Sequence, residues 1–332
     1  MKYLFLVSGE NLGLAKAEIE LFADAEVKET GGNVLVADAE KFDCSRLAFT
    51  KISGRFLFSC KKEELENNLR SFEWNRIYKK SFYIHTSHMR PEDAGKIADI
   101  VWNQIKNPKV ERNAGTVLEF MEMGSRIFCG LRIHENTEAF DARKAHKRPG
   151  FSPISLHPKL ARAAVNMTGI KKGKKLLDPF CGTGGILIEA GLMGIKCTGS
   201  DIDEKMLEMA RTNLNFFKIK GCSLKKADAT RIKIKADAIA TDPPYGKASS
   251  LRLAPFPASL RTAWKASSLH KTGIKKLYSG FLANAYRILK KGSRVVIIFP
   301  NHLSVRSKFS TIKKIDVYIH KGLTRTVNVL EK

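Results

Sequence analysis

The pattern of apolar and polar positions predicts a small mixed unit at the start of the chain. An apolar run at Tyr3–Val7 precedes a helix-like stretch over Leu12–Phe22, and an apolar strand follows at Val34–Ala37. We therefore expect a first domain over residues 1–48.

A second unit of the same kind is predicted over residues 49–140. Ser81–His85 alternates like a strand, and Ala94–Ile105 has helical periodicity. Thr116–Met123 and Arg126–Ile133 read as a hairpin. The two units together predict a small α+β region.

Residues 141–172 are expected to form a basic linker with little core of its own. Pro149, Pro153 and Pro158 bias the residues before them towards extended backbone. A helix is predicted to begin near Pro158, since proline is tolerated in a first turn.

From residue 173 onward, strands and helices alternate, which predicts an α/β domain over residues 173–332 with a mostly parallel, seven-stranded sheet. The clear strands are Lys175–Asp178, Lys196–Ser200, Ala236–Thr241, Arg294–Phe299, Ile315–His320 and Thr324–Leu330, and a further strand is expected before Asp228. The helices are Gly185–Met193, Glu204–Phe217 and Ile274–Leu289. A turn at Lys321-Gly322 indicates an antiparallel terminal strand, and Lys247–His270 is predicted to be a mobile loop.

Composition excludes several protein classes. The 332 residues are 43% hydrophobic and 27% charged, which is ordinary for a globular protein. No apolar run approaches the ~20 residues of a membrane span, and the apolar start is too short for a signal peptide. The six cysteines form no C-x-x-C pair, and no histidine spacing predicts a metal site. Scattered single cysteines suggest reduced thiols, so we expect a cytoplasmic protein without a bound metal.

The distribution of charge points to a nucleic-acid partner. Residues 1–140 hold 20 Lys/Arg against 21 Asp/Glu, a net charge of −1, whereas residues 141–332 hold 38 against 12, a net charge of +26. A field of one sign attracts polyanions. A compositional bias of the host would not confine the excess to one part of the chain.

A glycine-rich loop after the strand at residues 175–178 predicts a cofactor site. Asp-Pro-Phe-Cys-Gly-Thr-Gly-Gly (178–185) opens a helix, where glycines permit a close approach to a ligand. The third glycine of a dinucleotide motif is replaced by Leu187, and Asp178 would repel a phosphate. An acid at this position suits a cationic amino group, and S-adenosylmethionine carries one.

Two further acids stand at the ends of the next strands. Asp201 is placed to accept hydrogen bonds from ribose hydroxyls, and Asp228 is placed to accept one from an adenine amine. Each alone reads as an ordinary cap or turn residue. Three acids at one sheet edge, where open α/β sheets bind ligands, favour the cofactor interpretation.

The sequence Asp242-Pro-Pro-Tyr-Gly at the end of a later strand predicts the reactive corner. The Asp242 carboxylate and the Pro243 carbonyl can accept both N–H groups of an exocyclic amine and turn its lone pair towards a methyl donor. Tyr245 can stack on a flipped base. Methylation at a ring carbon needs a cysteine nucleophile, and none lies beside this motif.

These motifs, with Gly-Ser-Asp-Ile-Asp (199–203), resemble those of the tRNA guanine-N2 methyltransferases that carry an N-terminal THUMP domain. The segments 148–162 and 320–325 are similar to the archaeal branch that modifies guanosine 10. The resemblance implies a ferredoxin-like domain, a THUMP domain that grips tRNA, and a Rossmann-like class I methyltransferase domain. Gly150 departs from the family pattern, where a bulkier residue is expected, and would loosen the linker.

The resemblance and the local chemistry together name three sets of residues. The predicted catalytic residues are Asp242, Pro243, Pro244 and Tyr245. The predicted cofactor-binding residues are Asp178, Phe180, Cys181, Gly182, Thr183, Gly184, Gly185, Asp201, Ile202, Asp228 and Ala229, with Cys181 as a packing residue. The predicted RNA-binding residues are Arg143, Lys144, Lys147, Arg148, Lys159 and Arg162.

Several alternatives stay open at this point. The motif also serves adenine-N6 methyltransferases and enzymes that methylate guanine in ribosomal RNA. A non-catalytic RNA-binding protein on the same scaffold is a further alternative. The family includes chains that act alone and chains that work with a small zinc-binding activator subunit, so a monomer and a heterodimer are both expected forms.

Overall fold

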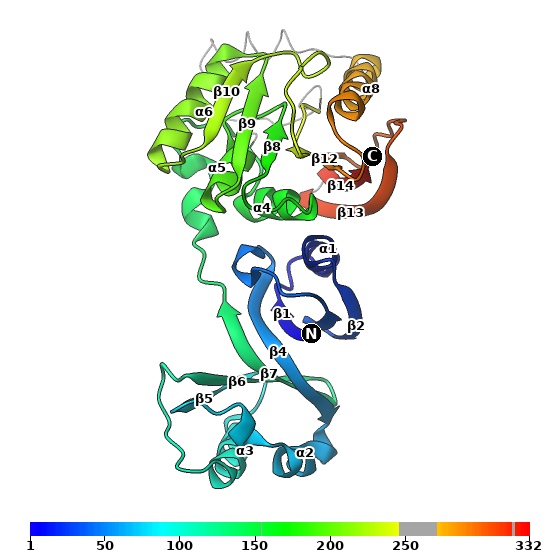
Figure 1. The fold of residues 1–332 in the computed structure, drawn as a ribbon. Helices are drawn as coiled ribbons and strands as arrows, with labels where there is room; N and C mark the ends of the chain where they lie inside the picture. The colour runs from blue at the N-terminus through cyan, green and yellow to red at the C-terminus, as the bar shows by residue number, and fades with distance from the viewer. Residues whose placement is uncertain (154, 246–270, 321–322) are drawn as a thin grey trace. The chain divides into compact units, whose positions relative to one another are not determined.

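A computed structural model describes residues 1–153, 155–245, 271–320 and 323–332 (Figure 1). The chain divides into two compact units, Met1–Glu138 and Ala139–Lys332. The loop predicted at Lys247–His270 and the turn predicted at Lys321-Gly322 lie outside the described residues.

The first unit contains a seven-stranded sheet in the order β2-β3-β1-β4-β7-β6-β5. Its strands are β1 (Lys2–Val7), β2 (Glu26–Gly31), β3 (Val34–Asp38), β4 (Thr50–Lys61), β5 (Phe82–Ser87), β6 (Thr116–Met123) and β7 (Arg126–Glu135). Its helices are α1 (Leu12–Ala23), α2 (Leu65–Ser71) and α3 (Pro91–Gln104). Neighbouring strands are antiparallel except β5 and β6, which are parallel.

The long strand β4 connects the two halves of this sheet. It pairs with β1 on one side and with β7 on the other. One continuous hydrogen-bonded sheet therefore joins strands from residues 1–48 to strands from residues 49–140. Two apolar clusters share the sheet. One contains Leu4, Val36 and Phe128, and the other contains Trp74 and Ile97 below α2 and α3.

The second unit contains another seven-stranded sheet, in the order β10-β9-β8-β11-β12-β14-β13. Its strands are β8 (Lys175–Asp178), β9 (Lys196–Asp201), β10 (Cys222–Lys226), β11 (Ala238–Thr241), β12 (Arg294–Pro300), β13 (Ser310–His320) and β14 (Leu323–Glu331). Its helices are α4 (Pro158–Met167), α5 (Gly185–Leu192), α6 (Glu204–Phe216) and α8 (Lys271–Ile288). The predicted α/β architecture with a mostly parallel sheet is confirmed. The antiparallel strand β14 lies second from the edge, between β12 and β13.

The chemistry of the termini explains where two of these helices begin. Pro158 occupies the first turn of α4, as predicted, and the Asp203 side chain caps α6 by accepting from the Lys205 N–H at 2.9 Å. Apolar side chains of α8 pack against the central strands of the sheet, at Leu177 and Ile239 among others.

The parallel strands of this sheet have their carboxyl ends at one edge. Helices α5 and α6 begin at that edge.

The segment predicted as a linker packs closely onto the second unit. Every residue of α4 except Lys159 is buried. The Gly150 N–H donates to Asn213 Oδ1 at 2.8 Å, and a Cβ at this position would lie 2.6 Å from the Met209 carbonyl oxygen. Gly150 therefore permits a close approach, and the expectation that it loosens this segment is wrong.

The prediction of six reduced thiols is wrong for one pair. Cys197 on β9 and Cys222 on β10 are direct partners in the parallel register and form a disulfide. Cross-strand register, which spacing in the sequence does not reveal, brings them together.

Among the described helices, none combines the length and apolar character that a membrane crossing requires.

Candidate active site

Asp178 ends β8 at the bottom of the glycine-rich loop and is only 2% exposed. Its Oδ1 accepts hydrogen bonds from the Thr241 hydroxyl at 2.7 Å and from the Phe180 N–H at 3.3 Å. Burial, with a smaller contribution from the nearby carboxylates of Asp242 and Asp201, raises the pKa of Asp178 to about 7 against the lowering effect of these hydrogen bonds. A buried acid among acids favours a cationic ligand group.

The glycines of the loop are required by its backbone. Gly182 and Gly184 have φ angles of +49° and +85°, a region that residues with a Cβ rarely adopt. Gly184 ends the loop, and α5 begins at Gly185. The Thr183 carbonyl accepts a hydrogen bond from the Asn213 amide at 2.9 Å, which joins the loop to α6. The N-terminus of α5 is thereby held at the carboxyl edge of the sheet.

The two other predicted acids lie at the ends of the neighbouring strands. Asp201 ends β9, and its Oδ2 accepts a hydrogen bond from the Gly182 N–H at 3.0 Å. Asp228 follows β10 and accepts from both the N–H and the hydroxyl of Thr230 at 2.8 Å. Burial raises the pKa of Asp201. The predicted placement of three acids on β8, β9 and β10, which are adjacent, agrees with the sheet order.

The predicted apolar residues of the site divide into buried and exposed ones. Phe180 packs edge-to-face on Phe281 of α8, with 5.4 Å between ring centroids, and Ala229 is buried in the same core. Cys181 is buried, and burial raises the pKa of its thiol far above the usual range, as expected for a packing residue. Ile202 is 71% exposed beside Asp201. An exposed apolar side chain there can cover a flat purine ring.

The three carboxylates of this edge fit S-adenosylmethionine, the methyl donor inferred from the sequence. Among the described residues, the groups that shift the pKa of Asp178 and Asp201 are neutral or negatively charged, so this edge of the sheet suits a positively charged ligand group. The amino group of S-adenosylmethionine would face Asp178, its ribose hydroxyls Asp201, and its adenine amine Asp228. Within the described ranges, no group of three or more His, Cys, Asp or Glu side chains is arranged to hold a metal ion.

The Asp-Pro-Pro-Tyr corner leaves β11 beside Asp178. The Tyr245 hydroxyl donates a hydrogen bond to Asp242 Oδ1, and the Tyr278 hydroxyl donates to the Pro244 carbonyl at 2.8 Å. Pro243 is buried, whereas Pro244 is exposed. Burial raises the pKa of Asp242, and the positive charge of Arg325 opposes that rise.

Three residues of this corner were missed by the sequence analysis. Arg325 pairs with Asp242, Tyr278 fixes the turn, and Thr241 bonds Asp178. Arg325 lies in the segment 320–325 that resembles the family, but the resemblance assigned no role to this residue. The antiparallel return of β14, which starts at the carboxyl edge opposite Pro300, was the signal that could have placed it.

The predicted RNA-binding residues need correction. Arg143, Arg148 and Arg162 are buried, at 8%, 4% and 2% exposure, and so cannot contact a polyanion from these positions. Arg143 and Arg162 form ion pairs with Glu189 of α5 at 2.7 and 2.9 Å. Of the remaining predicted residues, Lys147 is exposed, whereas Lys144 and Lys159 are half-buried. A basic sequence was mistaken for a basic surface.

Comparisons with known proteins agree with this geometry. The RMKL-like methyltransferase domain family matches residues 145–252. The chain is 32% identical to the tRNA (guanine(10)-N2)-dimethyltransferase of Methanothermobacter thermautotrophicus over the full length of both. It is 31% identical to the enzyme of the same name from Pyrococcus abyssi, with 96% of each covered.

A solved structure shows the same fold. TrmN from Thermus thermophilus aligns over 100% of both chains with a TM-score of 0.50 and 20% identity. The full-length sequence matches confirm the resemblance found in the motifs. The chain belongs to the tRNA (guanine(10)-N2)-dimethyltransferase family.

Proposed function

We propose that this chain transfers methyl groups from S-adenosylmethionine to the exocyclic N2 amine of guanosine 10 in tRNA. One observation carries the proposal: the Asp242 corner and the three-acid edge occupy adjoining strand ends of one sheet. The names of the full-length relatives support guanosine 10 as the target and two successive transfers.

The corner can prepare an otherwise poor nucleophile. Bound S-adenosylmethionine supplies an electrophilic methyl group on a sulfonium centre. The Asp242 carboxylate and the Pro243 carbonyl accept hydrogen bonds from the guanine amine and turn its lone pair out of the ring. As the N–CH₃ bond forms, the sulfonium S–CH₃ bond would break and leave a neutral thioether. The amine loses one proton, which the hydrogen-bonded Asp242 is placed to take.

Entry of the base requires an exchange of hydrogen bonds. In the structure, the Tyr245 hydroxyl donates a hydrogen bond to Asp242. A guanine flipped out of its helix replaces that hydroxyl with its own N–H groups, and the freed phenol ring can stack on the base. The Tyr278 hydroxyl on the Pro244 carbonyl keeps the backbone of the turn fixed during this exchange.

A nucleoside-mapping experiment tests this function. Unmodified tRNA is incubated with the chain and S-adenosylmethionine, and its nucleosides are mapped by mass spectrometry. We expect methylation on N2 of guanosine 10, and we expect Asp242→Ala to lower the rate at least about 10³-fold with cofactor affinity changed less than about twofold. Methylation of duplex DNA or ribosomal RNA instead would support the alternatives, and normal turnover by Asp242→Ala would remove the amine-orienting role.

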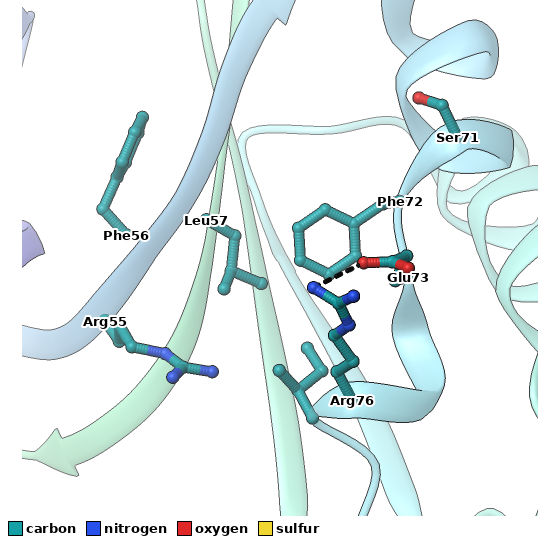
Figure 2. Close-up of a pocket in the computed structure, with 8 residues that line it drawn as sticks. Arg55, Phe56, Leu57, Ser71, Phe72, Glu73 and Arg76 are labelled. Atoms are coloured by element: carbon teal, nitrogen blue, oxygen red, sulfur yellow. Dashed lines mark ion pairs between the residues drawn. The ribbon is translucent and has the colours of Figure 1, made fainter.

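We propose that the first unit binds part of the tRNA through a pocket between β4 and the segment after α2. This pocket has a volume of about 580 Å³. Figure 2 shows Arg55, Leu57 and Phe72 lining it, with Arg76 paired to Glu73. The Nε of Arg55 is buried without a hydrogen-bond partner among the described residues. Aromatic rings beside guanidinium groups suit an unstacked nucleotide, so a single-stranded end of the tRNA fits here.

We further propose that the protein acts in the cytoplasm, as a monomer or as a heterodimer with a small zinc-binding subunit. Light scattering of the purified chain gives its oligomeric state. Methylation by the chain alone would favour the monomer, and activity that appears only with added cell extract and disappears with a zinc chelator would favour the heterodimer.

A further inference from the structure

Arg325 reaches the reactive corner from the far end of the chain. It lies near the start of β14, opposite Pro300 at the end of β12, and is 8% exposed. Because β14 runs antiparallel to its neighbours, its first residues lie at the edge where the parallel strands end. An arginine close to the end of the chain thus lies beside Asp242.

Arg325 contacts both functional side chains of the corner. Its Nη1 lies 3.8 Å from Asp242 Oδ2, and its guanidinium carbon lies 5.2 Å from the centroid of the Tyr245 ring. Tyr245 in turn bonds to Asp242. The three side chains form a closed triangle in a buried environment, where charge interactions are screened less than at the surface.

The length of the Arg325–Asp242 contact matters for its role. A distance of 3.8 Å is an ion pair without a hydrogen bond. The guanidinium therefore supplies charge to Asp242 without occupying the lone pairs that must accept the amine. A bidentate pair at hydrogen-bond distance would stabilise the carboxylate but would compete with the substrate.

An ionised Asp242 matches guanine. The Watson–Crick edge of guanine presents N1–H beside the N2 amine, which gives a carboxylate two adjacent donors, whereas adenine presents its amine beside an unprotonated N1. Among the described residues, the titratable and charged groups facing Asp242 are Arg325 from β14, Tyr245 of its own turn, Tyr278 from α8 and Asp178 from β8. Arg325 is the one cation in this set, and its charge opposes protonation of Asp242 together with the hydrogen bond from Tyr245.

We propose that Arg325 is a positioning residue that keeps Asp242 a carboxylate and holds the Tyr245 ring beside it, so that the corner accepts the amine edge of guanine. This role rests on the proposed function. It differs from a structural role because it predicts a change in the pH profile of the reaction.

The test compares Arg325→Gln and Arg325→Lys with a matched control. Arg294→Gln removes another arginine of the same sheet, which pairs with Glu331 at 3.0 Å away from the corner. Single-turnover methylation of tRNA is measured from pH 6 to 9, together with S-adenosylmethionine affinity by calorimetry and the melting temperature of each variant.

We expect Arg325→Gln to lower the rate roughly 10- to 100-fold at neutral pH and to move the acid limb of the profile to higher pH, since the pKa of Asp242 rises without its cation. Arg325→Lys should return the acid limb towards that of the wild type but only part of the rate, because lysine lacks the planar group that lies over Tyr245. Cofactor affinity and the behaviour of Arg294→Gln should stay within twofold of wild type.

Two outcomes would overturn the role of Arg325. One is an unchanged pH profile in an active Arg325→Gln enzyme, and the other is an equal profile for the Lys and Gln variants. If the Gln variant does not fold, the Lys variant alone decides, since it must keep the acid limb of the wild type. A wild-type chain that leaves tRNA guanosine unmethylated contradicts the proposed function instead, before any variant is measured.

Discussion

The protonation of Asp178 links cofactor binding to pH near neutrality. Burial sets its pKa at about 7 in the ligand-free protein. Only the carboxylate attracts a cationic amino group, so a ligand that binds the ionised form must displace a proton at lower pH. Affinity therefore approaches its full value only well above pH 7 and falls as the pH drops through that value.

We predict that S-adenosylmethionine binds more weakly as the pH falls from 7.5 to 5.5, by up to about tenfold per unit well below the pKa of Asp178. Calorimetry across this range measures the effect. Asp178→Asn should bind weakly at every pH, with a flatter profile. Methylthioadenosine, which lacks the amino group, is the control ligand, and an equally steep profile for it would contradict the role of Asp178.

At the scale of elements, the contact between α4 and α5 is built around Glu189. This carboxylate is 0% exposed and pairs with Arg143 and Arg162, and the guanidinium of Arg148 lies next to the start of α5. Two nitrogens of Arg148 have no hydrogen-bond partner among the described residues. Glu189 thus lies between the guanidinium groups of Arg143 and Arg162, and the contact between the two helices depends on its charge.

We predict that Glu189→Gln lowers the free energy of unfolding by about 3 to 5 kcal/mol, because it removes the buried carboxylate that pairs with the two buried guanidinium groups of Arg143 and Arg162. Thermal and denaturant unfolding measure this change. Glu208→Gln on the exposed face of α6 is the matched control and should change stability by less than about 0.5 kcal/mol. Equal stability of the two variants would show that the pairing is not required.

The elements of the second unit were largely predictable, because their apolar runs are short, regular and bounded by glycines. The site acids followed from the same pattern, since each ends a predicted strand. β4 was not predicted, because the apolar residues of Thr50–Lys61 follow neither the helical nor the alternating strand period. This strand is stabilised instead by hydrogen-bonded partners on both sides. The burial of Arg162 and the reach of Arg325 depend on tertiary packing, which local periodicity does not contain.

For the whole molecule, the uneven charge separates two kinds of contact with RNA. Residues 141–332 carry a net charge of +26, against −1 for residues 1–140. We infer that the basic part makes most phosphate contacts, while the first unit reads shape and an unpaired end. Binding by the basic part should therefore dominate the dependence on salt.

We predict that Lys147→Glu weakens tRNA binding and reduces the slope of log affinity against log salt by about 0.7 to 0.9, the value for one lost phosphate contact. Lys96→Glu, at an exposed position of α3 in the first unit, should leave the slope nearly unchanged. Filter binding at several salt concentrations measures both. A larger loss for Lys96→Glu would reverse the proposed division.

The bond between Tyr245 and Asp242 has a consequence for selectivity. A molecule that displaces the Tyr245 hydroxyl must supply a hydrogen-bond donor for the Asp242 carboxylate. It must also present a flat surface on which the displaced tyrosine ring can stack. Ammonia, lysine and water supply the hydrogen-bond donor but no flat surface. No stacking contact with the tyrosine ring then compensates for the lost Tyr245–Asp242 hydrogen bond. The Tyr245 hydroxyl thus competes with incoming ligands for Asp242, and a nucleobase meets both requirements.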